Sequence, residues 1–220
     1  MNDQQQSLQA QLDARKASWA EKASDHVKRA YKEGIDAVVE AGVEAQAKQV
    51  GDQAPDFSLT NATGQGVSLS DQLNKGPVVL TWYRGGWCPY CNITLRQLQL
   101  ELPNFQAKGA SLLALTPELP DKSLSTQEKH SLEFEVLSDV GNEVARSYGI
   151  VFKLSEEVGE MYQNAFDLHA YNGDESKELP LAATYVIDTD GRIQYAFLDA
   201  EYRNRAEPAE ILAILDKLNT

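Results

Sequence analysis

The chain has 220 residues, of which 42% are hydrophobic, so it can bury one full core and carry an appendage. Its 20 basic and 33 acidic residues give a formal net charge of -13. An acidic surface repels phosphate backbones and anionic lipid, so we expect no nucleic-acid or membrane partner. No stretch approaches the roughly 20 apolar residues of a membrane span, and residues 1–6 lack the regions of a secretion signal. The sequence therefore predicts a cytoplasmic protein.

Residues 1 to about 48 differ from the rest of the chain in composition. They hold neither a proline nor an evident strand, and apolar side chains recur in them at helical intervals, at Leu8, Leu12, Trp19, Val27, Tyr31, Ile35, Val38 and Val39. We expect two helices here, interrupted near Gly34. The change of composition predicts a boundary near Gly51, with an N-terminal helical extension over residues 1–50 and a second domain over residues 51–220.

After Gly51, short β-rich runs alternate with helical ones, which is typical of an α/β layer fold. The expected strands are a hairpin over 57–69, a fully buried strand over 77–83, and strands over 111–115, 134–137, 184–187 and 193–198. The expected helices begin near 89, 121, 142 and 211, and Pro103 should break or kink the first of them. Residues 150–180 are polar and should form an irregular insertion.

The two cysteines, Cys88 and Cys91, follow the predicted buried strand and a short glycine-containing turn. Pro89 suits the first position of a helix, so Cys88 should cap that helix and Cys91 should lie in its first turn. Free N–H groups and the helix dipole stabilise a thiolate there, and can lower a cysteine pKa by several units from about 8.5. The spacing places both sulfurs on one helix face, close enough for a disulfide. The pair is therefore predicted to store two electrons.

Two other uses of the cysteines are packing as inert buried residues and binding of zinc. Zinc needs about four ligands, but the remaining candidates are His26, His130 and His169, which are scattered and include no second paired motif. We therefore expect no metal, no organic cofactor and no catalytic histidine. The pair is also not the disulfide framework of a small secreted domain, so its position at a strand-to-helix junction favours chemistry over packing.

The run from Trp82 to Cys91 resembles the signature of the peroxiredoxin-like proteins in the alkyl hydroperoxide reductase and thiol-specific antioxidant (AhpC/TSA) superfamily, and its Cys-Pro-Tyr-Cys core is also that of glutaredoxins. Similar stretches are Gly51–Phe57, Val136–Asp139, Val144–Gly149 and Thr184–Gly191, so the resemblance covers about residues 51 to 220. It implies a thioredoxin fold of the α/β class, with a central mixed sheet flanked by helices. It also implies a peroxide substrate, an external reductant such as thioredoxin, glutaredoxin or glutathione, and a homodimer.

The resemblance also assigns roles to single residues. Aligned with the family pattern, Cys91 takes the place of the peroxidatic cysteine, and Cys88 takes that of a Thr or Ser three residues earlier. Arg84 stands in place of a Pro, and Ala182 stands where the superfamily often has an active-site Arg. Because an Arg and a hydroxyl ordinarily orient the peroxide, these departures keep an alternative function open.

Arg84 is the candidate replacement, since a guanidinium beside the helix start lowers a thiolate pKa and donates hydrogen bonds to a peroxide. A solvated or carboxylate-paired arginine is the equally weighted alternative. Trp87 and Tyr83 should form the pocket wall and, with Arg84, contact the substrate. Arg203 and Arg205 are expected to pair with surface acids.

The leading hypothesis is a thiol peroxidase active in antioxidant defence. Cys91 attacks the peroxide, becomes a sulfenic acid and condenses with Cys88 to a redox disulfide. The alternative is a thioredoxin- or glutaredoxin-like thiol-disulfide oxidoreductase, in which Cys88 attacks a substrate disulfide and Cys91 resolves the mixed disulfide. A third hypothesis makes the chain a redox-sensing or binding module, with the helical extension as its interaction surface.

Overall fold

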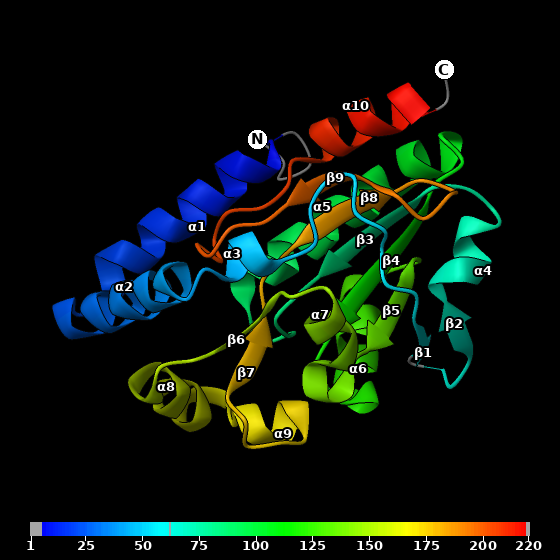
Figure 1. The fold of residues 1–220 in the computed structure, drawn as a ribbon. Coiled ribbons are helices and arrows are strands. Elements are labelled where there is room, and N and C mark those ends of the chain that lie inside the picture. The colour runs from blue at the N-terminus through cyan, green and yellow to red at the C-terminus, as the bar shows by residue number, and fades with distance from the viewer. Residues whose placement is uncertain (1–5, 62, 219–220) are drawn as a thin grey trace.

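A mixed five-stranded sheet forms the centre of the computed structural model, which describes residues 6–61 and 63–218 (Figure 1). Its strands lie in the order β5-β4-β3-β8-β9. β3 (Val78–Trp82) runs parallel to β4 (Ser111–Thr116), and β4 runs parallel to β5 (Glu135–Ser138). β8 (Thr184–Ile187) pairs antiparallel with β3, and β9 (Ile193–Phe197) pairs antiparallel with β8. Every strand predicted between 77 and 198 is present, and the α/β fold class is confirmed.

Helices cover both faces of this sheet. One face packs against α1 (Leu8–Lys22), α5 (Pro89–Ala107) and α10 (Pro208–Leu218). The other packs against α3 (Val43–Gln46), α4 (Leu69–Leu73) and α7 (Glu143–Ser147), while α6 (Pro120–His130) lies beside β5 and a 3-10 turn (Val140–Asn142) precedes α7. Leu80 of β3 lies opposite Leu113 of β4 and Tyr185 of β8. Because β3 has a strand on each side and helices above and below, all five of its residues are buried.

The N-terminal extension is helical, but its break lies elsewhere than predicted. α1 ends at Lys22, and α2 (Asp25–Glu40) begins after Ser24, whose hydroxyl oxygen accepts a hydrogen bond from the Val27 N–H at 3.3 Å. Gly34 lies inside α2. A serine cap stabilises a helix start by about 1 kcal/mol, which offsets the cost of about the same size that a glycine imposes inside a helix. The helix therefore begins at the Ser24 cap and continues through Gly34. The first five residues of the predicted extension lie outside the described residues.

The predicted hairpin is present as β1 (Ser58–Thr60) paired antiparallel with β2 (Gly66–Ser68), although Ala62 in its turn is outside the described residues. Pro103 does not break α5, which continues to Ala107. The helix buries Leu102 and Phe105 on either side of the proline, and this burial offsets the hydrogen bond that a proline cannot donate.

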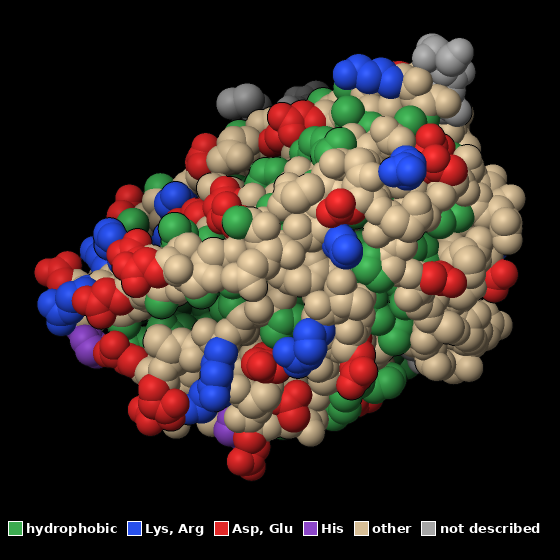
Figure 2. All heavy atoms as spheres, in the orientation of Figure 1, with side chains coloured by type: hydrophobic (Ala, Val, Ile, Leu, Met, Phe, Trp, Pro, Cys, Tyr) green, Lys and Arg blue, Asp and Glu red, His purple; other side chains and the backbone are tan. Residues whose placement is uncertain are grey.

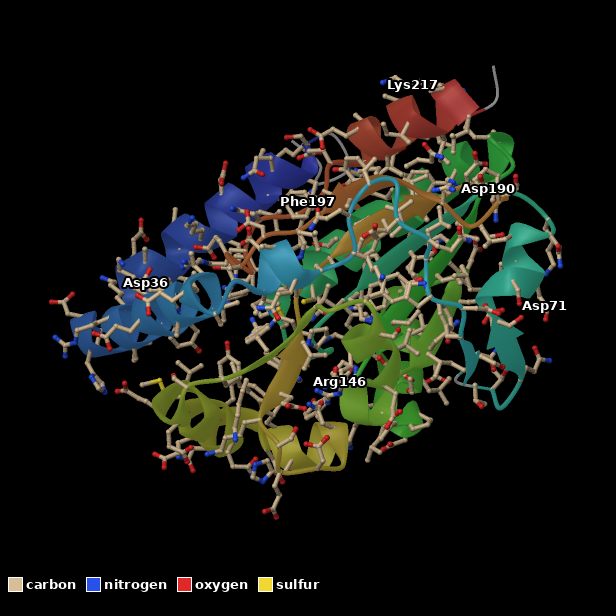
Figure 3. All side chains as sticks on the ribbon, viewed as in Figure 1. Asp36, Asp71, Arg146, Asp190, Phe197 and Lys217 are labelled. Atoms are coloured by element: carbon tan, nitrogen blue, oxygen red, sulfur yellow. The ribbon has the colours of Figure 1, made fainter. Side chains whose placement is uncertain are left out.

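Residues 150–180 are ordered, so the prediction of an irregular insertion is wrong. They form β6 (Val151–Lys153), α8 (Glu156–Phe166), α9 (Leu168–Asn172) and β7 (Glu178–Pro180), and β6 pairs antiparallel with β7. Their apolar residues build a small core of their own, at Val158, Tyr162, Leu168 and Leu179. Arg146 of α7, labelled in Figure 3, forms an ion pair of 2.8 Å with Glu178 of β7 and so ties this segment to the sheet domain. No helix in the described part of the chain is long and apolar enough to cross a membrane.

Candidate redox site

The two cysteines lie where β3 ends and α5 begins, as the sequence predicts. Cys88 is the N-cap of α5, and its sulfur accepts a hydrogen bond from the Cys91 backbone N–H at 3.4 Å. Pro89 occupies the first turn, where its missing N–H leaves no partner unsatisfied. Both cysteines are free thiols, and each is only 1% exposed. The cap and the helix start therefore hold both sulfurs in the core, one turn apart.

Two glycines shape the turn that leads into this helix. A Cβ atom on Gly86 would lie 2.1 Å from the Thr126 hydroxyl oxygen, and one on Gly85, whose φ is +154°, would lie 2.2 Å from the Trp87 indole nitrogen. The Gly86 N–H donates to a carboxylate oxygen of Glu118 at 2.8 Å, and the Gly86 carbonyl accepts from the Asn92 side chain at 2.8 Å. Only glycine fits this close approach, so the turn is fixed by packing and by two hydrogen bonds.

Arg205 contacts the sulfur of Cys91. Its Nη2 donates to Cys91 Sγ at 3.4 Å, while Nη1 donates to the carbonyl oxygens of Tyr202 and Asn204. Arg205 is 5% exposed, so the prediction that it pairs with a surface acid is wrong, because its side chain turns into the core that holds the cysteines. The same prediction is confirmed for Arg203, whose Nε donates to Glu201 at 2.6 Å.

The surroundings move the two thiol pKa values in opposite directions. Burial by itself raises the pKa of Cys91, but the hydrogen bond from the Cys88 thiol, the charges of Arg205 and Arg84, and the Arg84 backbone N–H outweigh it and lower that pKa well below its usual range. Burial, followed by the hydrogen bond with Cys91 and its charge, raises the pKa of Cys88. The surroundings therefore favour the thiolate form at Cys91 over that at Cys88.

Arg84 is neither solvated nor paired with a carboxylate, so the second alternative for it is wrong. It is 2% exposed, and its Nη2 donates to the Tyr162 hydroxyl at 2.9 Å. The guanidinium carbon lies 4.1 Å from the centre of the Tyr202 ring and 5.2 Å from that of Trp87, in cation–π contact. Within the described ranges, its Nε and Nη1 have no hydrogen-bond partner. Arg84 is thus a buried positive charge with two nitrogens that are free to donate hydrogen bonds.

A pocket of about 190 Å³ opens beside Cys88, with Arg84 and Trp87 among its lining residues. Tyr83 is not among them; it is buried in the core that holds the cysteines. A second, much smaller recess also reaches Arg84 and lies between α2 and α8, where Figure 2 shows hydrophobic side chains gathered. Of the three predicted substrate-binding residues, Arg84 and Trp87 therefore line an accessible space next to a cysteine.

Glu118 is a site residue that the sequence did not reveal. It is fully buried, and burial raises its pKa to about 7, with a further increase from the charge of Cys91 and an opposing effect of the hydrogen bond from Gly86. Glu118 follows β4, and β4 runs parallel to β3, which leads to the cysteines. Parallel neighbouring strands end at the same edge of a sheet, so residues that follow β4 lie near residues that follow β3. The expected pairing of these two strands could therefore have indicated that Glu118 lies near the cysteines.

Residues 50–196 match the family model described as AhpC/TSA family. The chain belongs to the AhpC/TSA family. It is 26% identical over 156 residues to peroxiredoxin Bcp of Escherichia coli, covering 71% of this chain and 89% of that protein. It is 25% identical over 146 residues to the thiol-disulfide oxidoreductase ResA of Bacillus cereus, covering 66% of this chain and 67% of that protein.

Among solved structures, this AhpC/TSA protein is similar to peroxidoxin BcpB of Mycobacterium tuberculosis, with a TM-score of 0.61, 24% identity, and coverage of 77% of this chain and 97% of that one. The thioredoxin fold expected from the sequence is thereby confirmed. The family match ends before Arg205 and begins after α1 and α2. This AhpC/TSA site is therefore completed by side chains from outside the matched region.

Proposed function

We propose that this protein is a thiol peroxidase that reduces hydrogen peroxide or organic hydroperoxides through a Cys88/Cys91 thiol-disulfide cycle. The observation that carries the proposal is the buried Cys91 sulfur, which accepts a hydrogen bond from Arg205 and has a lowered pKa. A thiolate is the nucleophilic form, and a partner thiol stands one helical turn away. Membership of the AhpC/TSA family and the similarity to a peroxiredoxin support the same activity.

The geometry suggests how the cycle proceeds. The Cys91 thiolate attacks one peroxide oxygen, the O–O bond breaks, and the other oxygen leaves as water or an alcohol after taking up a proton. Arg205 is placed to stabilise the separating oxygens, the task that Ala182 cannot perform. The Cys88 sulfur then displaces hydroxide from the Cys91 sulfenic acid, a proton completes a water molecule, and a disulfide forms. Thioredoxin, glutaredoxin or glutathione would supply the two electrons that reopen it.

The test mixes fully reduced protein rapidly with stoichiometric hydrogen peroxide and follows the loss of thiols. The wild type should lose two thiols quickly and end as a Cys88–Cys91 disulfide. Cys91→Ser should react about a thousandfold more slowly, since only an unactivated thiol remains. Cys88→Ser should lose its single thiol quickly but stop at the sulfenic acid. Undiminished oxidation of Cys91→Ser would rule out the assignment of Cys91 as the attacking cysteine.

One observation favours the alternative function. Cys88, and not Cys91, is among the residues that line the pocket, and the chain is similar to a protein named a thiol-disulfide oxidoreductase. In that function Cys88 attacks a substrate disulfide and Cys91 resolves it. Reduction of insulin disulfides that is lost in Cys88→Ser, together with peroxide oxidation no faster than that of a free thiol, would select this alternative.

We further propose a role in antioxidant defence, and the cytoplasm stays the predicted compartment. The homodimer that the resemblance implies also stays a prediction, as does the division of the chain at residue 50. Leu8 and Leu12 of α1 share a core with both cysteines, so the extension has a packing role besides any role in interaction. Light scattering on the purified chain would measure its mass in solution and test the dimer.

A further inference from the structure

The pocket beside Cys88 carries two positive charges in a strongly acidic protein. Arg15 of α1 and Arg84 line it, and no Asp or Glu of the described residues does, although the chain has a net charge of -13. Nε of Arg15 and two nitrogens of Arg84 lack a hydrogen-bond partner. A buried guanidinium with unpaired N–H groups is costly, and a carboxylate is the acceptor that satisfies it best. The pocket is therefore built for an anionic group.

The N-terminal helices limit what can reach this pocket. Arg15 and Trp19 of α1 and Tyr31 of α2 line one side, and Tyr162 and Phe166 of α8 line another. Cys88 itself is 1% exposed. A protein reductant must bring its own sulfur into contact with the disulfide, and these side chains surround that position. The pocket's volume of about 190 Å³ leaves room for a small molecule.

We propose that the Cys88–Cys91 disulfide is reduced by a low-molecular-weight thiol bearing a carboxylate, which Arg84 and Arg15 bind in this pocket. The inference builds on the proposed Cys88/Cys91 cycle and names the chemical class of its reductant. The incoming thiol fills the space next to Cys88, and its carboxylate accepts from the unpaired guanidinium nitrogens. The aromatic rings around Arg84 exclude water and strengthen that ion pair.

The chemistry balances with two such thiols. The first attacks Cys88 Sγ as a thiolate, the S–S bond breaks, and its electron pair passes to Cys91 Sγ. The second attacks the small-molecule sulfur of the mixed disulfide and releases Cys88, which takes up a proton, while the second proton goes to solvent. Cys91 is the better leaving group, because Arg205 Nη2 donates a hydrogen bond to Cys91 Sγ and so stabilises the thiolate that leaves.

The test uses protein oxidised by diamide, which closes the dithiol without any peroxide. Its reduction is followed by thiol counting after mixing with 3-mercaptopropionate or with the methyl ester of that acid, at equal thiolate concentrations. In the wild type the acid should react at least about tenfold faster than the ester, because the guanidinium groups hold its carboxylate. The overall negative charge of the protein works against the acid, so such a preference must arise at the site.

Arg84→Met and Arg15→Gln should each reduce the ratio of the two rates toward one, whereas the control Arg96→Gln, on an exposed part of α5, should not. Arg15 is only half-buried on α1, so Arg15→Gln still decides the matter if Arg84→Met fails to fold. Equal rates for acid and ester in the wild type would overturn the proposal, as would a preference that survives in Arg15→Gln. Reduction by thioredoxin as fast as by a saturating concentration of the acid would also overturn it. None of these results depends on reactivity toward peroxide.

Discussion

The sulfurs of Cys88 and Cys91 lie one turn apart on α5 in the same core, but they make different contacts. Each residue is 1% exposed, so burial does not distinguish them. Cys91 accepts a hydrogen bond from Arg205, whereas Cys88 lines the aromatic pocket and caps the helix. The first pKa is lowered and the second is raised. Arg84 and Arg205 lower the pKa of both thiols, so the contrast comes from the hydrogen bond between them, which favours the charged form of Cys91 and disfavours that of Cys88.

Removal of the guanidinium at Cys91 should give the largest effect. Arg205→Met should raise the Cys91 pKa and slow its oxidation by peroxide at neutral pH by roughly a hundredfold to a thousandfold, since a charge and an oxyanion donor are both lost. The measurement is the rate of thiol loss against pH, together with thiolate absorbance. Part of the lost rate should return as the pH rises, and Arg205→Lys should fall in between. A pH profile identical to that of the wild type would show that Arg205 does not tune Cys91.

A second prediction concerns Glu118, whose carboxyl faces the titrating groups Tyr83 and Cys91 and has a pKa raised to about 7 from 4.5. Between these two pH values the folded protein holds a proton that the unfolded chain releases. The contribution of Glu118 to the free energy of unfolding should therefore fall as the pH rises from about 4.5 to about 7, by on the order of 3 kcal/mol, and then stay level. The lowered pKa of Cys91 acts in the opposite direction, so the contribution of Glu118 is measured as the difference between the wild type and a Glu118 variant.

Glu118→Gln keeps an oxygen that can accept from the Gly86 N–H, so it should fold and should lose this dependence. Urea unfolding at about pH 5 and about pH 8 measures it, and the matched control is Glu160→Gln at an exposed position of α8. If the free energy of unfolding changes by the same amount between these two pH values in Glu118→Gln and in the wild type, Glu118 does not have the raised pKa.

The hydrogen bond between the two thiols can be removed by itself. Cys88→Ala should raise the Cys91 pKa by about one unit, because the donor to its thiolate is lost. Cys88→Ser keeps a hydroxyl donor at the same place and should retain most of the depression. Thiolate absorbance against pH measures both variants. Equal pKa values in the two would show that the hydrogen bond makes no contribution.

The smallest effect on Cys91 is expected at Arg203, which forms a half-buried pair with Glu201 and lies two residues from Arg205. Arg203→Gln should leave the oxidation rate of Cys91 unaltered, because Arg203 donates its hydrogen bonds to Glu201 and not to the cysteine. It is the matched control for Arg205→Met. A comparable loss of rate in both variants would mean that the general positive charge of this loop, and not the contact with Cys91, lowers its pKa.

Several predictions from sequence succeeded because the signal is local. The apolar run of β3 predicts a strand with neighbours on both sides, and Cys88-Pro89 predicts the start of a helix. Both predictions depend only on residues that are adjacent in the sequence. The same reasoning failed at Ser24, where a short polar cap decided a boundary that Gly34 had been expected to set. It also failed at Val158 and Tyr162, because a few apolar positions among many polar ones hid a helix that packs on its own small core.

The sequence by itself thus determined the fold class and placed the two cysteines together where a strand ends and a helix begins. Only the tertiary structure decided which of them ionises and what surrounds them. Arg205 is 114 positions from Cys91, and Glu118 is 32 from Gly86, so no periodicity or motif joins them. Arg15 reaches the pocket only because α1 packs against α5. Charges act through space and not along the chain, and the pKa of a buried thiol is therefore a property of the packed structure.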